Sequence, residues 1–469
     1  MRTQEDTINI RLIYIILPLI VIVAAVSFLT TQNYLYVVVP GLAILALFLL
    51  GRFPEIGYYA IVFMIPFGAF RGAAPWVIAF ALTALTLFQF LLNKRITDRL
   101  KSSLWIWFFV LYAVSAFSAV ISAYPETAYH ELNLLASAYI FIALNLVYLS
   151  YKSFSKTLPA VLIISISIGA FLGTIAHYFE IPFLAHTIGT GVDPRAVGAA
   201  TDPNNFSLML IFSMPLLVHW FFSAKRPAEK LFVVLVVFMN IYGIVLTYSR
   251  GGAIVFLITL LFILFEHRKR FKTKYLGLLL ASVSISALMV IALVPADYWE
   301  RQKTMTHTKT DTAVGRRLSY IVVAWDTFKK NPIIGTGPGT YKNVFAESGY
   351  ARHFALETEL EKGPVGLQRR AHNTYIEHLI GTGIIGFLVF LIIIWIALRN
   401  FRKALDNCKK SGREDIVSII TAYRLSFISV LFYLLVFSDV YHKYLLVSLA
   451  LSQVAIRLSK EDPSKETGE

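Results

Sequence analysis

The sequence predicts an all-α, polytopic membrane protein with one large loop outside the membrane, and three observations support this prediction. Of its 469 residues 57% are hydrophobic, and the mean hydropathy of +0.66 lies far above the range of soluble proteins. Apolar stretches long enough to cross a hydrocarbon core of ~30 Å as a helix recur along nearly the whole chain. Clusters of lysine and arginine occupy alternate loops, as the cytoplasmic loops of membrane proteins do.

The apolar stretches predict about 12–14 spans, and the shorter ones could be half-spans. In chain order the spans are expected at residues 12–29, 34–50, 56–70, 76–92, 104–123, 132–149, 158–179, 205–223, 231–248, 253–265, 275–294, 373–398, 417–437 and 444–457. The basic clusters then place both chain ends in the cytoplasm, together with the loops at 94–101, 152–156, 225–230, 268–274 and 399–413. Much of the net charge of +15 is therefore topological, and no basic groove with interleaved aromatic residues predicts nucleic-acid binding.

This topology predicts five regions along the chain. They are N-terminal spans (1–190), spans that carry arginines on the outer face (191–294), a large outer loop (295–371), C-terminal spans (372–458) and a polar tail (459–469). The first apolar run resembles a signal peptide, but many spans follow it and no convincing cleavage site is present, so we expect it to be the first helix. The single cysteine, Cys408, lies in a cytoplasmic loop, and no disulfide is expected.

The outer loop contains one strong helical pattern. From Arg317 onward, apolar residues at three- and four-residue spacing predict an amphipathic helix that lies on the membrane surface or caps a cavity; they are Leu318, Ile321, Val322, Trp325 and Phe328. Asn331-Pro332 should end this helix. The glycines of residues 335–339 suggest turns, because a phosphate-binding loop would need a Gly-Lys-Ser/Thr sequence and a preceding strand.

Arg250 lies in the sequence Thr-Tyr-Ser-Arg-Gly-Gly (247–252), between two long apolar runs. Tyr248, Ser249 and the two glycines would bring backbone amides and a helix N-terminus to the same place, which suits an anion. The alternative is an arginine at a helix end that extends its charge toward water. Arg424, inside a late span, is expected to pair with an unidentified partner in the bundle.

Two further outer segments carry arginines. Arg195 lies in a loop before Asp202, and either Asp202 or Asn204 is expected to cap the next helix. Arg316 and Arg317 begin the amphipathic helix. An arginine fork can hold a pyrophosphate through two hydrogen bonds, although a solvated loop or surface arginine remains the alternative at each position.

His372 lies where the outer loop enters the next span, followed by Asn373 and Glu377. A neutral histidine can accept a proton, and nearby arginines would keep it neutral; a capping or packed histidine is the alternative. Glu377 is a candidate second acid or base, although its spacing does not place it on the same helix face. His372 and His378 are six residues apart and so do not have the spacing of a zinc site, and no metal is expected.

Four strings stand out in the sequence: Arg195-Ala-Val-Gly with Asp202-Pro-Asn-Asn, Tyr248-Ser-Arg-Gly-Gly, Arg317-Leu followed by Asn331-Pro-Ile-Ile-Gly-Thr-Gly-Pro-Gly, and His372-Asn-Thr-Tyr followed by Gly381-Thr-Gly-Ile-Ile-Gly. In their order and spacing they resemble the O-antigen ligase and O-antigen polymerase family of bacterial envelope glycosyltransferases. The resemblance covers residues 190–400, whereas the first seven spans match only in being hydrophobic.

The resemblance implies transfer of a glycan from undecaprenyl pyrophosphate to an acceptor hydroxyl, such as one on the lipid A core, in lipopolysaccharide biosynthesis. The reaction would take place at the periplasmic face of the inner membrane, without cofactor, metal or nucleotide. It implies that Arg250 and Arg317, with Arg195 and Arg316 as further candidates, bind the pyrophosphate, while His372 assists the acceptor. Arg317 is preferred over Arg316 because it lies fifteen residues before Pro332, as in the family pattern.

Two other functions remain compatible with the sequence. A polymerase would use the same donor and a glycan acceptor, and the sequence does not separate it from a ligase. A flippase or transporter for a lipid-linked sugar would place charges along a path to the cytoplasm and would contain discontinuous helices. The candidate charges instead gather at one face, apart from Arg424.

Overall fold

The computed structural model describes residues 50, 53–68, 74–92, 94–179, 196, 200, 202–268, 312–355 and 357–461, and this part of the chain contains helices and no strand. The helices are α3 (Pro54–Phe63), α4 (Ala74–Leu92), α5 (Lys94–Leu100), α6 (Trp105–Val120), α7 (Pro125–Tyr148), α8 (Leu158–Phe179), α9 (Pro203–Ser223), α10 (Pro227–Leu246), α11 (Arg250–His267), α14 (Thr312–Lys330), α15 (Tyr341–Glu347), α16 (Gly349–His353), α17 (Glu357–Leu360), α18 (Gly363–Gly366), α19 (Thr374–Lys410), α20 (Glu414–Tyr433) and α21 (Lys443–Leu458). A π-helical turn, Ser153–Thr157, precedes α8.

The predicted all-α membrane fold is confirmed. Within the described residues, seven helices are long and apolar enough to span a membrane: α7, α8 with its preceding turn, α9, α10, α11, α19 and α20. Two shorter apolar helices lie at Val77–Leu91 and Trp105–Val120. The spans predicted at 12–29 and 275–294, and nearly all of the one at 34–50, lie outside the described residues.

The chain divides into two compact units. The smaller unit is formed by Met1–Phe63 with Arg71–Asp98 and contains α3 and α4. These two helices pack where Gly57 of α3 meets Leu82 of α4, since a side chain on Gly57 would press against the Leu82 methyl groups. The larger unit, Met64–Phe70 with Arg99–Glu469, contains α6 to α21 and all the described candidate site residues.

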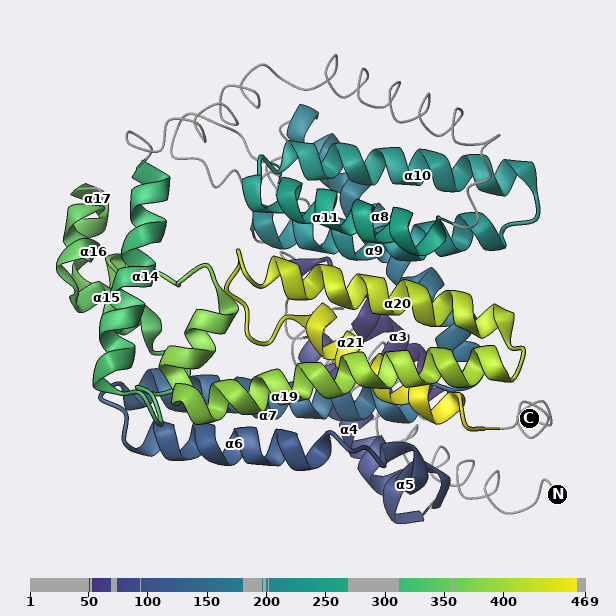
Figure 1. Cartoon of the computed structure of the whole chain (residues 1–469), viewed down its shortest axis with the longest axis horizontal. Coiled ribbons are helices and arrows are strands. Elements are labelled where there is room, and N and C mark those ends of the chain that lie inside the picture. Colours follow the sequence, from purple (N-terminus) through teal and green to yellow (C-terminus); the bar gives the residue numbers. More distant parts are fainter. Residues whose placement is uncertain are drawn as a thin grey trace, which may run out of the picture. The chain divides into compact units, whose positions relative to one another are not determined.

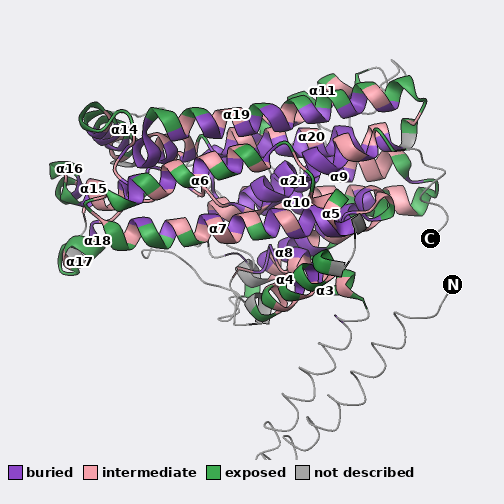
Figure 2. Ribbon diagram, turned by 90° about the horizontal axis from the view of Figure 1, so that it is seen from below, coloured by how far each residue is buried: buried purple, intermediate pink, exposed green. Residues whose placement is uncertain are grey.

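The larger unit is a helix bundle in which α20 is central. It packs against α9, α11, α19 and α21, while α19 also packs against α6 and α21 against α7. Helix α20 buries large side chains that include Tyr423, Phe427 and Tyr433. Buried residues line the inward faces of these helices, and exposed ones lie along their outer flanks (Figure 2).

The two ends of this bundle differ. Helices α14 to α18 gather at one end, here called the α14 end, and α14 runs across the direction of the long helices (Figure 1). At the opposite end, Arg457 donates hydrogen bonds to the carbonyl oxygens of Leu146 and Leu149 at 3.1 and 2.6 Å. These carbonyls lie in and just after the last turn of α7, where no intrahelical donor is available, so the guanidinium caps the helix.

Helix α19 is broken near its start, at Gly383, whose φ of 62° and ψ of −168° are not helical. The loop between α14 and α15 fills the break. Thr336 and Gly337 donate backbone hydrogen bonds to the carbonyls of Ile380 and Gly381, at 2.9 and 3.0 Å. In return, Ile384 donates to the carbonyl of Pro332 at 2.9 Å. The loop therefore satisfies backbone groups that the break leaves without helical partners.

Positive φ values at Gly335, Gly337 and Gly339 confirm that the glycine cluster serves turns, and α14 ends at Lys330 as predicted. The apolar stripe of α14, predicted to lie on the membrane surface or to cap a cavity, is largely distinct from the face by which the helix packs. Leu318, Ile321, Val322 and Trp325 are exposed, whereas the buried face consists of Tyr320, Val323 and Ala324. Helix α14 has apolar residues on both faces, so periodicity alone could not identify the one that packs.

Candidate active site

Two helix N-termini meet at the α14 end of the bundle. Asp202 caps α9 by accepting hydrogen bonds from the amides of Asn204 and Asn205 at 2.8 and 3.0 Å, as predicted for this residue. Ser249 caps α11 by accepting from the Gly252 amide at 3.0 Å. The Ser249 hydroxyl also donates to the Asn204 side-chain oxygen at 2.9 Å, which links the two N-termini.

Arg250 is the first residue of α11 and is half-buried. Tyr248, two residues earlier, is buried and has a φ of 52°, a conformation that is uncommon for a residue with a side chain. Gly251 and Gly252 are buried, and a side chain on Gly252 would collide with Ser207 of α9. The two glycines therefore allow α11 to pack closely, and the tight turn at Tyr248 sets where Arg250 begins the helix.

Arg195 lies outside the described residues. The next residue, Ala196, is buried and donates a backbone hydrogen bond to the carbonyl of Leu246 at 2.9 Å. Leu246 is the last residue of α10, directly before the Thr-Tyr-Ser-Arg segment. Ala196 and the turn before Arg250, which are about fifty residues apart in sequence, therefore lie side by side.

Arg316 and Arg317 lie in the first half of α14. Arg317 is exposed and Arg316 is half-buried, on the side of the helix that faces the core with Tyr320. Within the part of the chain that the structure describes, neither guanidinium forms an ion pair with a carboxylate. Tyr320 stacks at an angle against the His372 ring, with 5.9 Å between the ring centroids, and so connects α14 to His372.

His372 is half-buried and has a φ of 50°. A left-handed conformation in a residue other than glycine costs about 1–3 kcal/mol and persists only where the surroundings hold it. The residue after it, Asn373, caps α19 by accepting a hydrogen bond from the Ile376 amide at 3.1 Å. The Asn373 amide in turn donates to the hydroxyl of Ser438 at 3.0 Å, and the Thr374 amide donates to the Leu434 carbonyl at 2.9 Å.

The pKa of His372 is lowered to about 4, and burial is the largest cause. The positive charges of Arg317, Arg316 and Arg369 contribute to this lowering, with Arg317 acting most strongly among them. Asp202 at the start of α9 acts in the opposite direction. His372 is therefore neutral at pH 7, and the electrostatic influence of these residues shows that α9 and α14 lie close enough to act on its ring.

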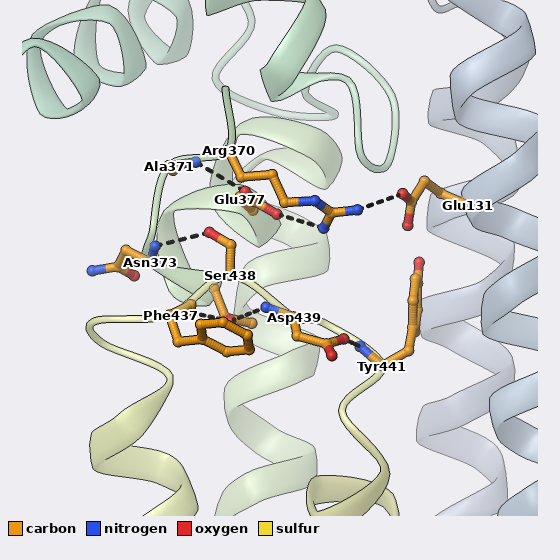
Figure 3. Close-up of polar contacts among 10 residues, drawn as sticks. Glu131, Arg370, Ala371, Asn373, Glu377, Phe437, Ser438, Asp439 and Tyr441 are labelled. Carbon is orange, nitrogen blue, oxygen red and sulfur yellow. Dashed lines mark hydrogen bonds and ion pairs between the residues drawn. The ribbon is translucent and has the colours of Figure 1, made fainter. Parts of the chain in front are cut away.

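Glu377 lies one turn into α19 and is buried, with 5% of its surface exposed. One oxygen accepts a hydrogen bond from the Ala371 amide at 3.0 Å. The other lies 3.4 Å from Arg370, whose second nitrogen lies 3.3 Å from Glu131 of α7 (Figure 3). The carboxylate is thus engaged on the side of the chain that precedes His372.

Sequence reasoning missed Glu131, Arg369 and Arg370. Glu131 has 2% of its surface exposed, and a buried acidic residue in a span is itself a signal of function or pairing. The predicted span began at residue 132 and so left Glu131 outside, whereas α7 begins at Pro125. The two arginines carried no signal, because the sequence places them in a loop rich in charge.

Arg424 pairs with Glu266 of α11 at 2.7 Å, which supplies the structural partner that the sequence left unnamed. This ion pair joins α20 to α11 and does not involve the residues around His372. No group of three or more histidine, cysteine, aspartate or glutamate side chains arranged to hold a metal ion occurs in the described part of the chain.

Comparison with known proteins adds two findings. A protein of Haemophilus influenzae, described as an uncharacterized protein, is 23% identical over 342 residues, which covers 70% of this chain and 79% of the relative. Residues 233–391 match the O-antigen ligase family. The matched segment contains Arg250, Arg316, Arg317 and His372, and the match supports the O-antigen ligase and polymerase family that the motifs predict.

Proposed function

We propose that this protein is an O-antigen ligase-type glycosyltransferase that moves a glycan from undecaprenyl pyrophosphate to an acceptor hydroxyl. One observation carries the proposal. A neutral histidine, His372, lies under the electrostatic influence of Arg316 and Arg317, and neither arginine forms an ion pair within the described part of the chain. Positive groups beside a proton acceptor are what a pyrophosphate leaving group and a hydroxyl nucleophile require.

In the proposed reaction the acceptor hydroxyl attacks the anomeric carbon of the donor sugar. His372 takes the hydroxyl proton, and the bond between that carbon and the pyrophosphate oxygen breaks. The pyrophosphate leaves on its polyprenyl carrier with both bonding electrons. Arg250 and Arg317 would stabilise the developing negative charge, with Arg195 and Arg316 as further candidates, and no metal ion is needed for this role.

The lowered pKa of His372 describes the free site, in which no pyrophosphate is bound. A bound pyrophosphate would offset the charge of Arg317 and Arg316, and so raise the proton affinity of His372 when the donor is in place. The same arginines that hold the donor would therefore make the base effective only in the complex.

We assign the α14 end of the bundle to the periplasm. The family and the apolar helices indicate a multi-pass protein of the inner membrane. The orientation in the membrane is inferred from the basic loops, such as residues 399–413. These loops occur at alternate connections between the spans, and loops rich in lysine and arginine favour the cytoplasm. Nucleotide sugars are cytoplasmic, so an active site on the opposite side favours a lipid-linked donor.

A polymerase, which extends a glycan instead of modifying a lipid acceptor, is the second candidate, because the family includes both activities. A deletion strain separates them: loss of a ligase leaves long glycans on the carrier, and loss of a polymerase leaves single repeats. The flippase alternative gains little support. Helix α19 is discontinuous at Gly383, but the backbone of the α14–α15 loop occupies the break.

The decisive experiment compares His372→Ala with wild type in single-turnover transfer and in binding of an undecaprenyl-pyrophosphate analogue. We expect turnover to fall by about 10²- to 10⁴-fold while donor binding is retained. His219 of α9 provides a control. Its Nδ1 lies 2.9 Å from the hydroxyl of Ser418 in α20, within the bundle, and His219→Ala should transfer glycan normally. Wild-type transfer by His372→Ala would remove this residue from catalysis.

A further inference from the structure

The backbone around His372 is fixed from both sides. Before it, the Ala371 amide donates to a Glu377 oxygen at 3.0 Å. After it, the Asn373 amide donates to the hydroxyl of Ser438 at 3.0 Å. His372 itself has a φ of 50°, which these flanking hydrogen bonds must maintain, because an unconstrained chain would relax toward negative φ.

Glu377 is poorly placed to exchange protons with a substrate. Its side chain is buried, one oxygen is bound to the Ala371 amide and the other faces Arg370 at 3.4 Å. Both oxygens are therefore occupied by groups of the protein. The second acid or base that the sequence suggested for this position would need an oxygen that faces the acceptor.

Arg370 connects this carboxylate to the rest of the bundle. Its other terminal nitrogen lies 3.3 Å from Glu131, which comes from α7 and is buried (Figure 3). Burial alone would lower the pKa of Arg370, but Glu377 and Glu131 outweigh that effect and raise it, so the guanidinium remains charged between them. Gly339 closes the cluster, since a side chain at this position would collide with Glu131.

We infer that Glu377 is a positioning residue that holds the His372 backbone in its left-handed conformation through the hydrogen bond from the Ala371 amide, an inference that rests on the proposed function. Arg370 connects the carboxylate of Glu377 to α7, because its other terminal nitrogen contacts Glu131 on that helix. His372 lies in the connection between α18 and α19, which these contacts hold in place. The hydrogen bond from the Ala371 amide to Glu377 fixes the backbone of the residue next to His372.

Three replacements of Glu377 separate a positioning role from a chemical one. Glu377→Gln keeps an oxygen at the same reach for the Ala371 amide but loses the charge. Glu377→Asp keeps the charge but draws the oxygens back by one methylene group, and Glu377→Ala removes them. A positioning role predicts that Glu377→Gln retains kcat within about threefold, while kcat of Glu377→Asp and of Glu377→Ala falls by about 10- to 100-fold. In all three, KM for the donor should change by less than about threefold, because the arginines are untouched.

The control is the ion pair between Arg424 and Glu266 at 2.7 Å. Glu266→Ala also removes one partner of a bundle ion pair, and we expect it to lower thermal stability without changing turnover per folded molecule. If Glu377→Gln is as inactive as Glu377→Ala, or if Glu377→Asp is more active than Glu377→Gln, the hydrogen bond from the Ala371 amide does not set turnover and the inference is overturned. Wild-type turnover by Glu377→Asp and Glu377→Ala also overturns the inference.

The same assay includes His372→Ala. If this variant transfers glycan normally, the proposed function fails regardless of Glu377. If it is inactive while all Glu377 variants have wild-type turnover, only the positioning inference fails.

Discussion

Replacing Gly383 with alanine tests whether the break in α19 is held by the loop that fills it. Gly383 has a φ of 62° and a ψ of −168°, a region open essentially to glycine alone. A side chain here would also collide with the Ile333 carbonyl group of the loop. Alanine should therefore drive the backbone toward a continuous helix and expel the loop.

The magnitude follows from the groups that lose their partners. Backbone strain contributes about 2 kcal/mol. If the helix becomes continuous, the carbonyls of Ile380 and Gly381 turn to their own helix, and the amides of Thr336 and Gly337 lose acceptors. Each unsatisfied buried donor adds about 1–2 kcal/mol, so the expected destabilisation is ~4–6 kcal/mol.

Gly412 provides the matched control. It has a φ of +70°, but a side chain there would meet no atom within 4 Å. Gly412→Ala should therefore cost only the left-handed strain, about 1–2 kcal/mol. Both variants would be purified in detergent and unfolded by heat, and glycan transfer would be measured on the folded fraction. Equal losses of stability in the two variants would show that the loop does not hold the break.

Four further outcomes are expected. Replacing Arg250 or Arg317 by alanine should weaken binding of an undecaprenyl-pyrophosphate analogue as well as turnover, and lysine should restore little, because it lacks the planar fork; unchanged affinity in both would exclude them from the donor site. Since the pKa of His372 is lowered to about 4, its neutral form persists as pH falls from 7 to 5, and kcat/KM should decline on the acid side only near pH 4. The acid decline of kcat should occur at a higher pH, because the bound anion raises the pKa of His372. A decline of kcat/KM near pH 6.5 would contradict this. An impermeant thiol reagent should label Ser348→Cys but not Ser411→Cys in intact cells, and the reverse pattern would invert the topology. Transfer should continue in EDTA, whereas a loss that one divalent ion restores would establish a metal requirement.

Much of the fold could be predicted because hydropathy determines where a helix can cross a membrane. The predicted span at 205–223 corresponds closely to α9, Pro203–Ser223, where Asp202 supplies the expected cap. The span predicted at 373–398 continues as helix to Lys410, because a helix extends into polar sequence once its apolar part is anchored. The break at Gly383 depends on a loop about fifty residues away, so local sequence could not reveal it.

The candidate site was predictable where a charge stands out against an apolar background. This applies to Arg250, and to His372 at the start of a span. It does not apply to Arg370, because a loop arginine gains its significance only from the carboxylates that the fold brings to it. Nor could the sequence say that Arg317 is exposed while Arg316 is on the core side of α14, because apolar residues surround both.

The exchange of hydrogen bonds between the α14–α15 loop and α19 also constrains the order in which the protein is assembled. Residues 331–340 and 380–385 complete each other's backbone pairing, although some fifty residues separate them in the chain. Until both are on the same side of the bilayer, the amides and carbonyls at the break have no partners. Biosynthesis must therefore bring the α14–α15 loop and the start of α19 to the same side of the bilayer before α19 can reach its final form, and the loop acts as an internal template for the helix that follows it.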